Sequence, residues 1–121
     1  MSQTILLIED NEQNRYLVTY LLEKKGYKVV RACDGPEGIE AAKTMQPDLI
    51  LLDIQLPGMD GYEVAIAIRN LPSLKDTPMI AVTSYAMVGD REKSIASGCN
   101  GYIEKPINPD KFVQEISVFL Q

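Results

Sequence analysis

The sequence predicts an α/β fold, an open and doubly wound parallel sheet of five strands with five helices. Short continuous apolar runs alternate along the chain with longer segments of helical period, a pattern that gives parallel strands joined by right-handed crossovers. The 121 residues suffice for one domain, but they are about half of what a closed eight-stranded barrel needs. The 45% hydrophobic and 24% charged residues are typical of a soluble globular protein.

The five predicted strands are the apolar runs. Residues 5–8 and 49–52 are apolar throughout, like strands that are buried on both faces. Residues 27–30 form a weaker run, and residues 79–82 follow a proline. Residues 101–103 are short, so we expect this strand near an edge of the sheet.

The segments between the runs have helical period and carry helix start and stop signals. In the first, Leu17/Leu21 and Val18/Leu22 are spaced by four, and Gly26 is a natural stop. The predicted helices cover residues 11–25, about 36–45, about 61–71 and about 87–97, and a fifth begins after residue 108.

The ends of two of these helices are set by proline and polar caps. Pro36 suits the first turn of the second helix, in which Ile39 and Ala42 face inward. The fifth helix has Asn108 as its cap, and Ile107 and Phe112 form a hydrophobic staple.

Composition excludes several classes of function. A net charge of −5 argues against nucleic acid as the main partner. The absence of histidine removes Ser-His-Asp triads, imidazole bases and most zinc sites. Cys33 and Cys99 lie far apart, so we expect reduced and mostly buried thiols. No run approaches the ~18 apolar residues of a membrane span, and the N-terminus lacks the basic region of a secretory signal, so we expect a cytoplasmic protein with no membrane partner.

Polar residues follow four of the predicted strands. These are Glu9-Asp10, Asp53, Thr83-Ser84 and Lys105-Pro106. Because the carboxyl ends of parallel strands meet at one edge of such a sheet, these residues converge on one crevice. An aspartate after a strand is often only a turn or cap residue, which fits Asp34 and Asp60 beside Gly35 and Gly61.

Three clustered carboxylates repel one another unless a cation lies between them. Oxygen ligands alone favour Mg²⁺. A carboxylate can also act as a nucleophile toward phosphorus. Lys105 can then supply a positive charge, and Thr83 can donate a hydrogen bond to a phosphoryl oxygen.

Five short motifs occur in order along the chain: IEDN at residues 8–11, LDIQLP at 52–57, MDG at 59–61, VTS at 82–84 and YIEKP at 102–106. Together they resemble a two-component response-regulator receiver domain, and the resemblance covers essentially the whole chain, residues 1–121. It implies the flavodoxin-like (βα)5 fold with strand order 2-1-3-4-5. Among receivers the sequence is most similar to single-domain cell-division regulators of the DivK type, and it is also similar to the receivers of hybrid histidine kinases.

The resemblance implies roles for the residues of the crevice. Asp53 matches the phosphoacceptor, and Lys105 matches the lysine that binds the phosphate. Asp10 matches a direct ligand of Mg²⁺ and Glu9 an acidic partner that acts through water, a position at which many members have Asp. Gln55 matches the position that gives its backbone carbonyl to the metal.

Further positions match the conformational switch of receivers. Thr83 matches the switch hydroxyl and Tyr102 the switch aromatic. The Lys105-Pro106 bond is expected to be cis. Tyr85, two residues beyond Thr83, is bulky and is expected to influence hydrolysis of the phosphate.

The implied function is that of a single-domain response regulator in a phosphorelay. It takes a phosphoryl group from a phosphohistidine on a histidine kinase or a histidine phosphotransfer protein, and it loses that group slowly by itself. It is a switch rather than an enzyme and is expected to be a monomer. The signal leaves by binding a downstream protein in trans through the fourth helix, fifth strand and fifth helix, roughly residues 87–97 and 102–112.

Two other functions share parts of this pattern. A flavodoxin-like electron carrier needs a phosphate loop rich in Ser, Thr and Gly after the first strand, where residues 9–12 are Glu-Asp-Asn-Glu. An aspartate-nucleophile phosphatase usually has a second Asp two residues after the nucleophile, where Gln55 stands and cannot act as an acid.

Overall fold

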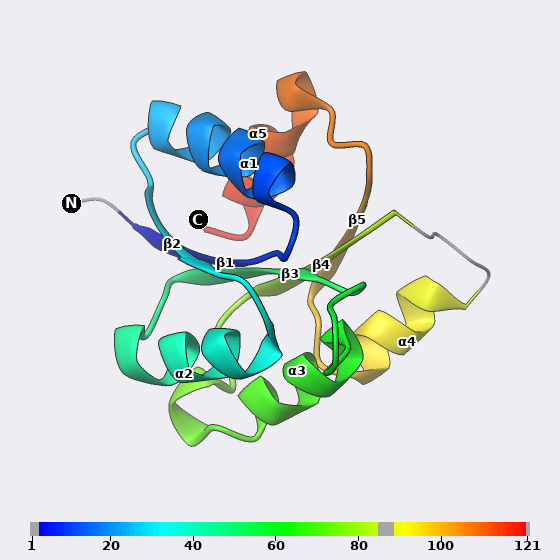
Figure 1. Ribbon diagram of the computed structural model, residues 1–121. Coiled ribbons are helices and arrows are strands. Elements are labelled where there is room, and N and C mark those ends of the chain that lie inside the picture. Colours follow the sequence, from blue (N-terminus) through cyan, green and yellow to red (C-terminus); the bar gives the residue numbers. More distant parts are fainter. Residues whose placement is uncertain (1–2, 85–88, 121) are drawn as a thin grey trace.

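The computed structural model describes residues 3–84 and 89–120 and contains one five-stranded parallel sheet (Figure 1). The strand order is β2-β1-β3-β4-β5, which confirms the predicted fold and topology. The strands are β1 (Thr4–Ile8), β2 (Lys28–Ala32), β3 (Leu49–Asp53), β4 (Met79–Thr83) and β5 (Gly101–Glu104). The helices are α1 (Glu12–Lys24), α2 (Gly35–Met45), α3 (Gly61–Arg69), α4 (Asp90–Ala96) and α5 (Pro109–Val118), with a short 3-10 helix, η1 (Pro72–Leu74).

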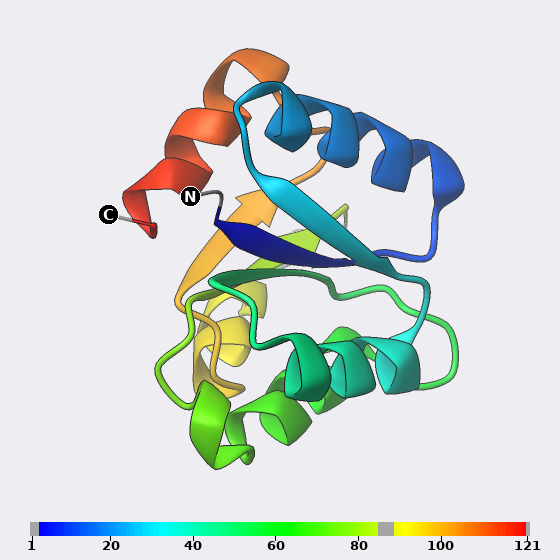
Figure 2. The same ribbon diagram turned by 90° about the vertical axis from the view of Figure 1, so that its left-hand side faces the viewer.

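The helices cover both faces of the sheet. α1 and α5 lie on one face, and α2, α3 and α4 lie on the other (Figures 1 and 2). Every pair of neighbouring strands is parallel, so all five strands run in one direction and place their carboxyl ends at one edge, on the right of Figure 1. No helix in residues 3–84 and 89–120 is long and apolar enough to cross a membrane.

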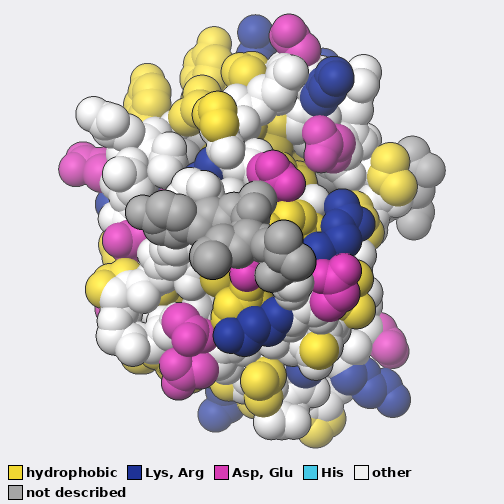
Figure 3. Space-filling model, turned by 90° about the vertical axis from the view of Figure 1, so that its right-hand side faces the viewer, with side chains coloured by type: hydrophobic (Ala, Val, Ile, Leu, Met, Phe, Trp, Pro, Cys, Tyr) yellow, Lys and Arg dark blue, Asp and Glu magenta, His cyan; other side chains and the backbone are white. Residues whose placement is uncertain are grey.

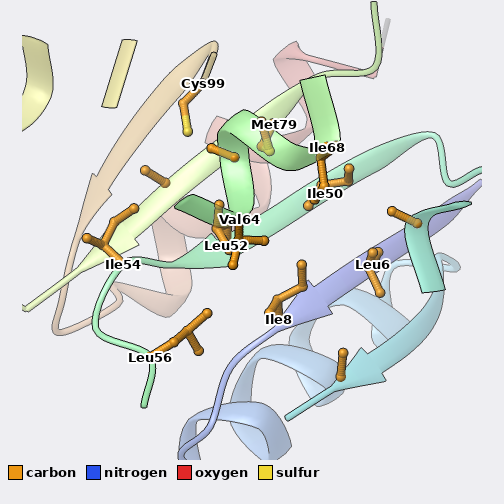
Figure 4. Packing of buried hydrophobic residues seen from close by; sticks show 14 of the residues in the cluster. Leu6, Ile8, Ile50, Leu52, Ile54, Leu56, Val64, Ile68, Met79 and Cys99 are labelled. Carbon is orange, nitrogen blue, oxygen red and sulfur yellow. The ribbon is translucent and has the colours of Figure 1, made fainter. Parts of the chain in front are cut away.

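Alternate residues of the central strands pack into two separate cores. Leu6 and Ile8 of β1 lie with Val64 and Ile68 of α3 in the core between the sheet and α2 and α3 (Figure 4). Their neighbours in β1, at positions 5 and 7, face the opposite core with α1 and α5. This is why the runs at 5–8 and 49–52 are continuously apolar.

Most element boundaries agree with the predictions to within one residue, and three elements, β2, α3 and α4, differ by two or more residues. β2 begins at Lys28, because the Tyr27 N–H donates to the Leu22 carbonyl at the end of α1, and β2 continues to Ala32 in register with Ile8. α3 ends at Arg69, because the chain becomes extended at Leu71 before the proline that opens η1. α4 begins at Asp90, and the first predicted residues of this helix, 87 and 88, lie outside the described residues.

Four polar side chains cap helices, and for Asp34, Asp60 and Asn108 this agrees with the prediction. Asn11, Asp34, Asp60 and Asn108 each accept a backbone N–H in the first turn of the helix that follows. Asp34 and Asp60 are therefore structural. The prediction for the cysteines is wrong in part: Cys99 is buried, but Cys33 is exposed because it follows the edge strand β2.

Candidate functional site

The carboxyl ends of four strands form one polar cleft of about 220 Å³. Figure 3 views this edge of the molecule, where acidic and basic side chains lie close together. The cleft is lined by Glu9, Asp10, Asn11, Asn14, Asp53, Gln55, Ser84 and Lys105. The predicted convergence of residues from β1, β3, β4 and β5 is confirmed.

The three carboxylates lie together as the sequence predicts. Glu9, Asp10 and Asp53 each offer one oxygen, and these oxygens lie within 4.8 Å of one another. Glu9 and Asp53 are each only 3% exposed, whereas Asp10 is exposed to solvent. The set is accessible from one side and contains oxygen donors alone, which suits Mg²⁺ and not zinc.

The loop after β3 fixes the position of Asp53. The backbone N–H of Gln55 donates to Asp53 Oδ1 at 3.0 Å. The Gly61 N–H donates to the carbonyl of Ile54 at 3.0 Å, so the start of α3 returns to the end of β3. A Cβ at Gly61 would lie 2.6 Å from the carbonyl oxygen of Asp53, which only glycine avoids.

Lys105 joins the two buried carboxylates. Its Nζ lies 2.7 Å from Glu9 Oε1 and 3.4 Å from Asp53 Oδ2. The Lys105-Pro106 bond is cis, as predicted. The two distances from Nζ show that Lys105 carries its positive charge into the cleft.

Burial and the neighbouring charges separate the pKa values of the two buried acids. Burial, together with the hydrogen bond and charge of Glu9, raises the pKa of Asp53 to about 8, although Lys105 opposes this. Burial also disfavours ionised Glu9, but the hydrogen bonds with Asp53 and Lys105 outweigh it and hold the pKa of Glu9 below its ordinary value. A cation bound between the carboxylates would favour the ionised form of both.

Gln55 has a role in the cleft that the sequence did not predict for it. Its side-chain amide donates through Nε2 to Thr83 Oγ1. Its Oε1 accepts from the Ser84 N–H at 3.1 Å. The resemblance to receivers implies a role only for the backbone carbonyl of Gln55, because the direction of a side chain in a loop cannot be read from the sequence.

Arg15 is a second residue that the sequence did not single out. Its Nη1 donates to the carbonyls of Glu9 and Asp10, at 2.8 and 2.9 Å. Arg15 lies in the first turn of α1, and it ties that turn to the loop that holds both acids. The signal for Arg15 in the sequence is that of a basic residue five positions after Asp10.

Tyr102 lies outside the cleft lining. It is half-buried in β5, and the guanidinium of Arg91 in α4 lies 5.7 Å from the centre of its ring. Tyr62 of α3 also contacts α4, because its hydroxyl donates to Asp90 at 3.3 Å. Tyr85, expected to influence hydrolysis, lies outside the described residues.

The sequence profile of the response regulator receiver domain matches residues 5–117. The chain belongs to this receiver family. The polar-differentiation response regulator DivK of Brucella ovis is 41% identical over 120 residues, which cover 99% of this chain and 98% of that protein. The predicted resemblance to receivers of the DivK type is thereby confirmed.

Two solved structures are similar over almost the whole receiver. The chemotaxis protein CheY4 of Vibrio cholerae has a TM-score of 0.94 at 28% identity, with 99% of this chain and 100% of that chain covered. The receiver domain of the sensor histidine kinase PA1611 of Pseudomonas aeruginosa has a TM-score of 0.91 at 33% identity, with 99% and 98% covered. That structure has a magnesium ion coordinated in its active-site cleft.

Membership places this chain among the components of two-component systems. Receivers act as phosphoacceptor switches rather than as classical enzymes. They interact with histidine kinases and with downstream targets.

Proposed function

We propose that this receiver is the response regulator of a phosphorelay and that Asp53 accepts the phosphoryl group. The observation that carries the proposal is the buried Asp53 carboxylate, which opens into a cleft with Lys105 at 3.4 Å and two further acids beside it. The donor is a phosphohistidine on a histidine kinase or a histidine phosphotransfer protein, because the chain has no histidine of its own.

The transfer exchanges one bond for another. An Asp53 oxygen forms a bond to phosphorus while the P–N bond to the donor imidazole breaks, and the electron pair of that bond leaves with the nitrogen, which takes a proton from solvent. Lys105 offers its positive charge to the transferring group. Thr83, at the end of β4, offers a hydroxyl to a phosphoryl oxygen.

We assign the metal site to Glu9, Asp10 and Asp53, with the backbone carbonyl of Gln55. The oxygen donors fit Mg²⁺, which would stabilise negative charge on the phosphoryl group. Arg15 holds the loop that carries two of these acids. We also propose that the protein is a monomer and acts in the cytoplasm. Its receiver domain covers residues 1–121.

The direct test uses phosphoramidate, a small donor whose P–N bond resembles that of phosphohistidine. Incubated with phosphoramidate and Mg²⁺, the wild-type protein is expected to gain the mass of one phosphoryl group. Hydroxylamine should remove this group, as it removes an acyl phosphate. A protein that stays unmodified under these conditions contradicts the proposal.

Replacing Asp10 with Ala is expected to weaken Mg²⁺ binding at least about tenfold, because one exposed oxygen ligand is lost. Mg²⁺ raises the melting temperature of the wild type by mass action, and this rise should be much smaller in the variant. Without metal the variant should be as stable as the wild type or more so, because one repelling charge is gone. Asp76→Ala, exposed before β4 at the opposite edge, is the control. Equal responses of D10A and wild type to Mg²⁺ would remove Asp10 from the site.

We further propose that the output surface is formed by α4, β5 and α5. Phosphorylation adds about two negative charges at the cleft. Thr83 then moves toward the phosphoryl group and leaves space that the half-buried Tyr102 can enter. This movement of Tyr102 separates its ring from Arg91 on α4. A downstream protein that prefers one arrangement of this face reads the signal in trans.

Amide hydrogen exchange tests this output surface. With phosphate on Asp53, rates are expected to change most in α4, in β5 and at the start of α5. Thr83→Ala should still accept phosphate but should show much smaller changes in these segments, because the hydroxyl that follows the phosphoryl group is gone. Changes confined to α2 would place the output surface elsewhere.

A further inference from the structure

The Gln55 side chain contacts two groups that lie beside the proposed phosphorylation site. Its Oε1 accepts from the Ser84 N–H at 3.1 Å and lies 3.4 Å from the Ser84 hydroxyl oxygen, and its Nε2 donates to Thr83 Oγ1. Thr83 is the last residue of β4 and is buried, with 1% of its surface exposed. The amide thus connects the end of β4 to the loop after β3.

The orientation of this amide is fixed by its partners. A backbone N–H can only donate, so the oxygen of the Gln55 amide must face Ser84, and the NH₂ group then faces Thr83. The amide accepts from Ser84 and donates to Thr83 at the same time. A carboxylate at this position could accept from the Ser84 N–H and from the Thr83 hydroxyl but could not donate to that hydroxyl, and an apolar side chain could do neither.

A phosphoryl group on Asp53 needs hydrogen-bond donors for its oxygens. Asp53, Gln55, Ser84 and Lys105 line the same cleft, with Thr83 at the end of the strand beside Asp53. The Ser84 N–H has a single hydrogen, which Gln55 holds in the unphosphorylated protein. A phosphoryl oxygen and the Gln55 amide oxygen therefore compete for it, and movement of Thr83 toward Asp53 must break its contact with Gln55.

We propose that the Gln55 side chain is an internal competitor of the phosphoryl group, which holds Ser84 and Thr83 in the unphosphorylated arrangement and is displaced when Asp53 is phosphorylated. Gln55 is thus a positioning residue, and its amide opposes both uptake of phosphate and the switch. The inference rests on the proposed function of Asp53. The backbone carbonyl of Gln55 keeps its separate place in the proposed metal site.

Gln55→Met is the central variant, because methionine has a similar length and no amide. Gln55 is half-buried on a loop, where methionine is tolerated. Without metal or phosphate, the Ser84 amide hydrogen should exchange about fivefold faster in this variant, the factor expected for one lost hydrogen bond. Exchange is followed at Ser84 by NMR, a readout that needs no phosphoryl transfer.

Phosphoryl uptake is then measured from phosphoramidate with saturating Mg²⁺. An Asp53 oxygen bonds to phosphorus while the P–N bond breaks, and ammonia leaves. Gln55→Met should be phosphorylated roughly three- to tenfold faster than the wild type, because no hydrogen bond to the amide has to be broken. Gln55→Glu should be slower than the wild type, since it keeps an acceptor for the Ser84 N–H and adds a negative charge.

Gln13→Met, on an exposed position of α1, is the matched control and should behave as the wild type in both measurements. An unchanged Ser84 exchange rate in Gln55→Met, slower uptake by that variant, or Gln55→Glu as fast as Gln55→Met would each overturn the competitor role. If the wild type takes up phosphate and Gln55→Met is no faster, this role fails while the proposed function stands. If the wild type takes up none, the proposed function fails and the competitor role fails with it.

Discussion

Asp53→Asn is expected to lower phosphoryl uptake from phosphoramidate roughly a thousandfold or more, below detection by intact mass. An amide is a poor nucleophile compared with a carboxylate, and neither of the two remaining acids can replace it. Glu9 is paired with Lys105 at 2.7 Å, and Asp10 is exposed to solvent.

The same variant should fold normally. Asparagine has the shape of aspartate, and its oxygen can still accept from the Gln55 N–H. It also removes the penalty of a buried carboxyl next to Glu9, so the metal-free variant should melt at a higher temperature than the wild type. Asp76→Asn, an exposed position, controls for the change of charge and should leave uptake unchanged. Uptake by Asp53→Asn at the wild-type rate would refute the assignment of the nucleophile.

Lys105→Met is expected to lower the free energy of unfolding by about 3 kcal/mol, the usual cost of removing one partner of a buried ion pair. The Lys105 side chain is 12% exposed and that of its closest partner, Glu9, is 4% exposed, so solvent compensates little for the loss. Uptake of phosphate should also fall strongly, because the positive charge beside Asp53 is gone.

A double-mutant cycle separates these two effects. In a Glu9→Gln background, Lys105→Met should cost less than half as much stability, because the 2.7 Å pair no longer exists. Uptake should still fall in that background, since the charge facing Asp53 is lost in either case. Lys111→Met, an exposed lysine of α5, should change neither quantity. Equal costs of Lys105→Met in both backgrounds, measured by urea unfolding, would show that Glu9 is not its main partner.

The fold was predictable because the central strands are buried on both faces. Such strands need apolar residues at every position, as in the run from Leu49 to Leu52, so they contrast clearly with the helical segments. β2 was less clear, because an edge strand exposes Lys28 and Arg31 and its ends depend on hydrogen bonds of the preceding helix. The acids of the cleft were predictable because these strands are clear in the sequence. Glu9 and Asp10 follow β1, and Asp53 is the last residue of β3.

Residues on loops and helices were harder to place. The Gln55 amide reaches Thr83 and Ser84 only because the loop after β3 bends back, and that bend depends on contacts with α3 that no local pattern reveals. Arg15 acts through backbone carbonyls, so its signal in the sequence is only that of a basic residue five positions after Asp10. The exposure of Cys33 follows from β2 lying at the edge of the sheet, which is a property of the topology.

The identity of the phosphorylated residue is the most direct test of the account. Borohydride reduces an acyl phosphate to an alcohol and releases phosphate, so a phosphorylated aspartate becomes homoserine, which peptide mass spectrometry can locate. After reaction of the wild type with phosphoramidate and Mg²⁺, followed by borohydride, we predict homoserine at position 53 and an unmodified peptide containing Glu9 and Asp10. Reduction at Glu9 or Asp10, with Asp53 unchanged, would contradict the account.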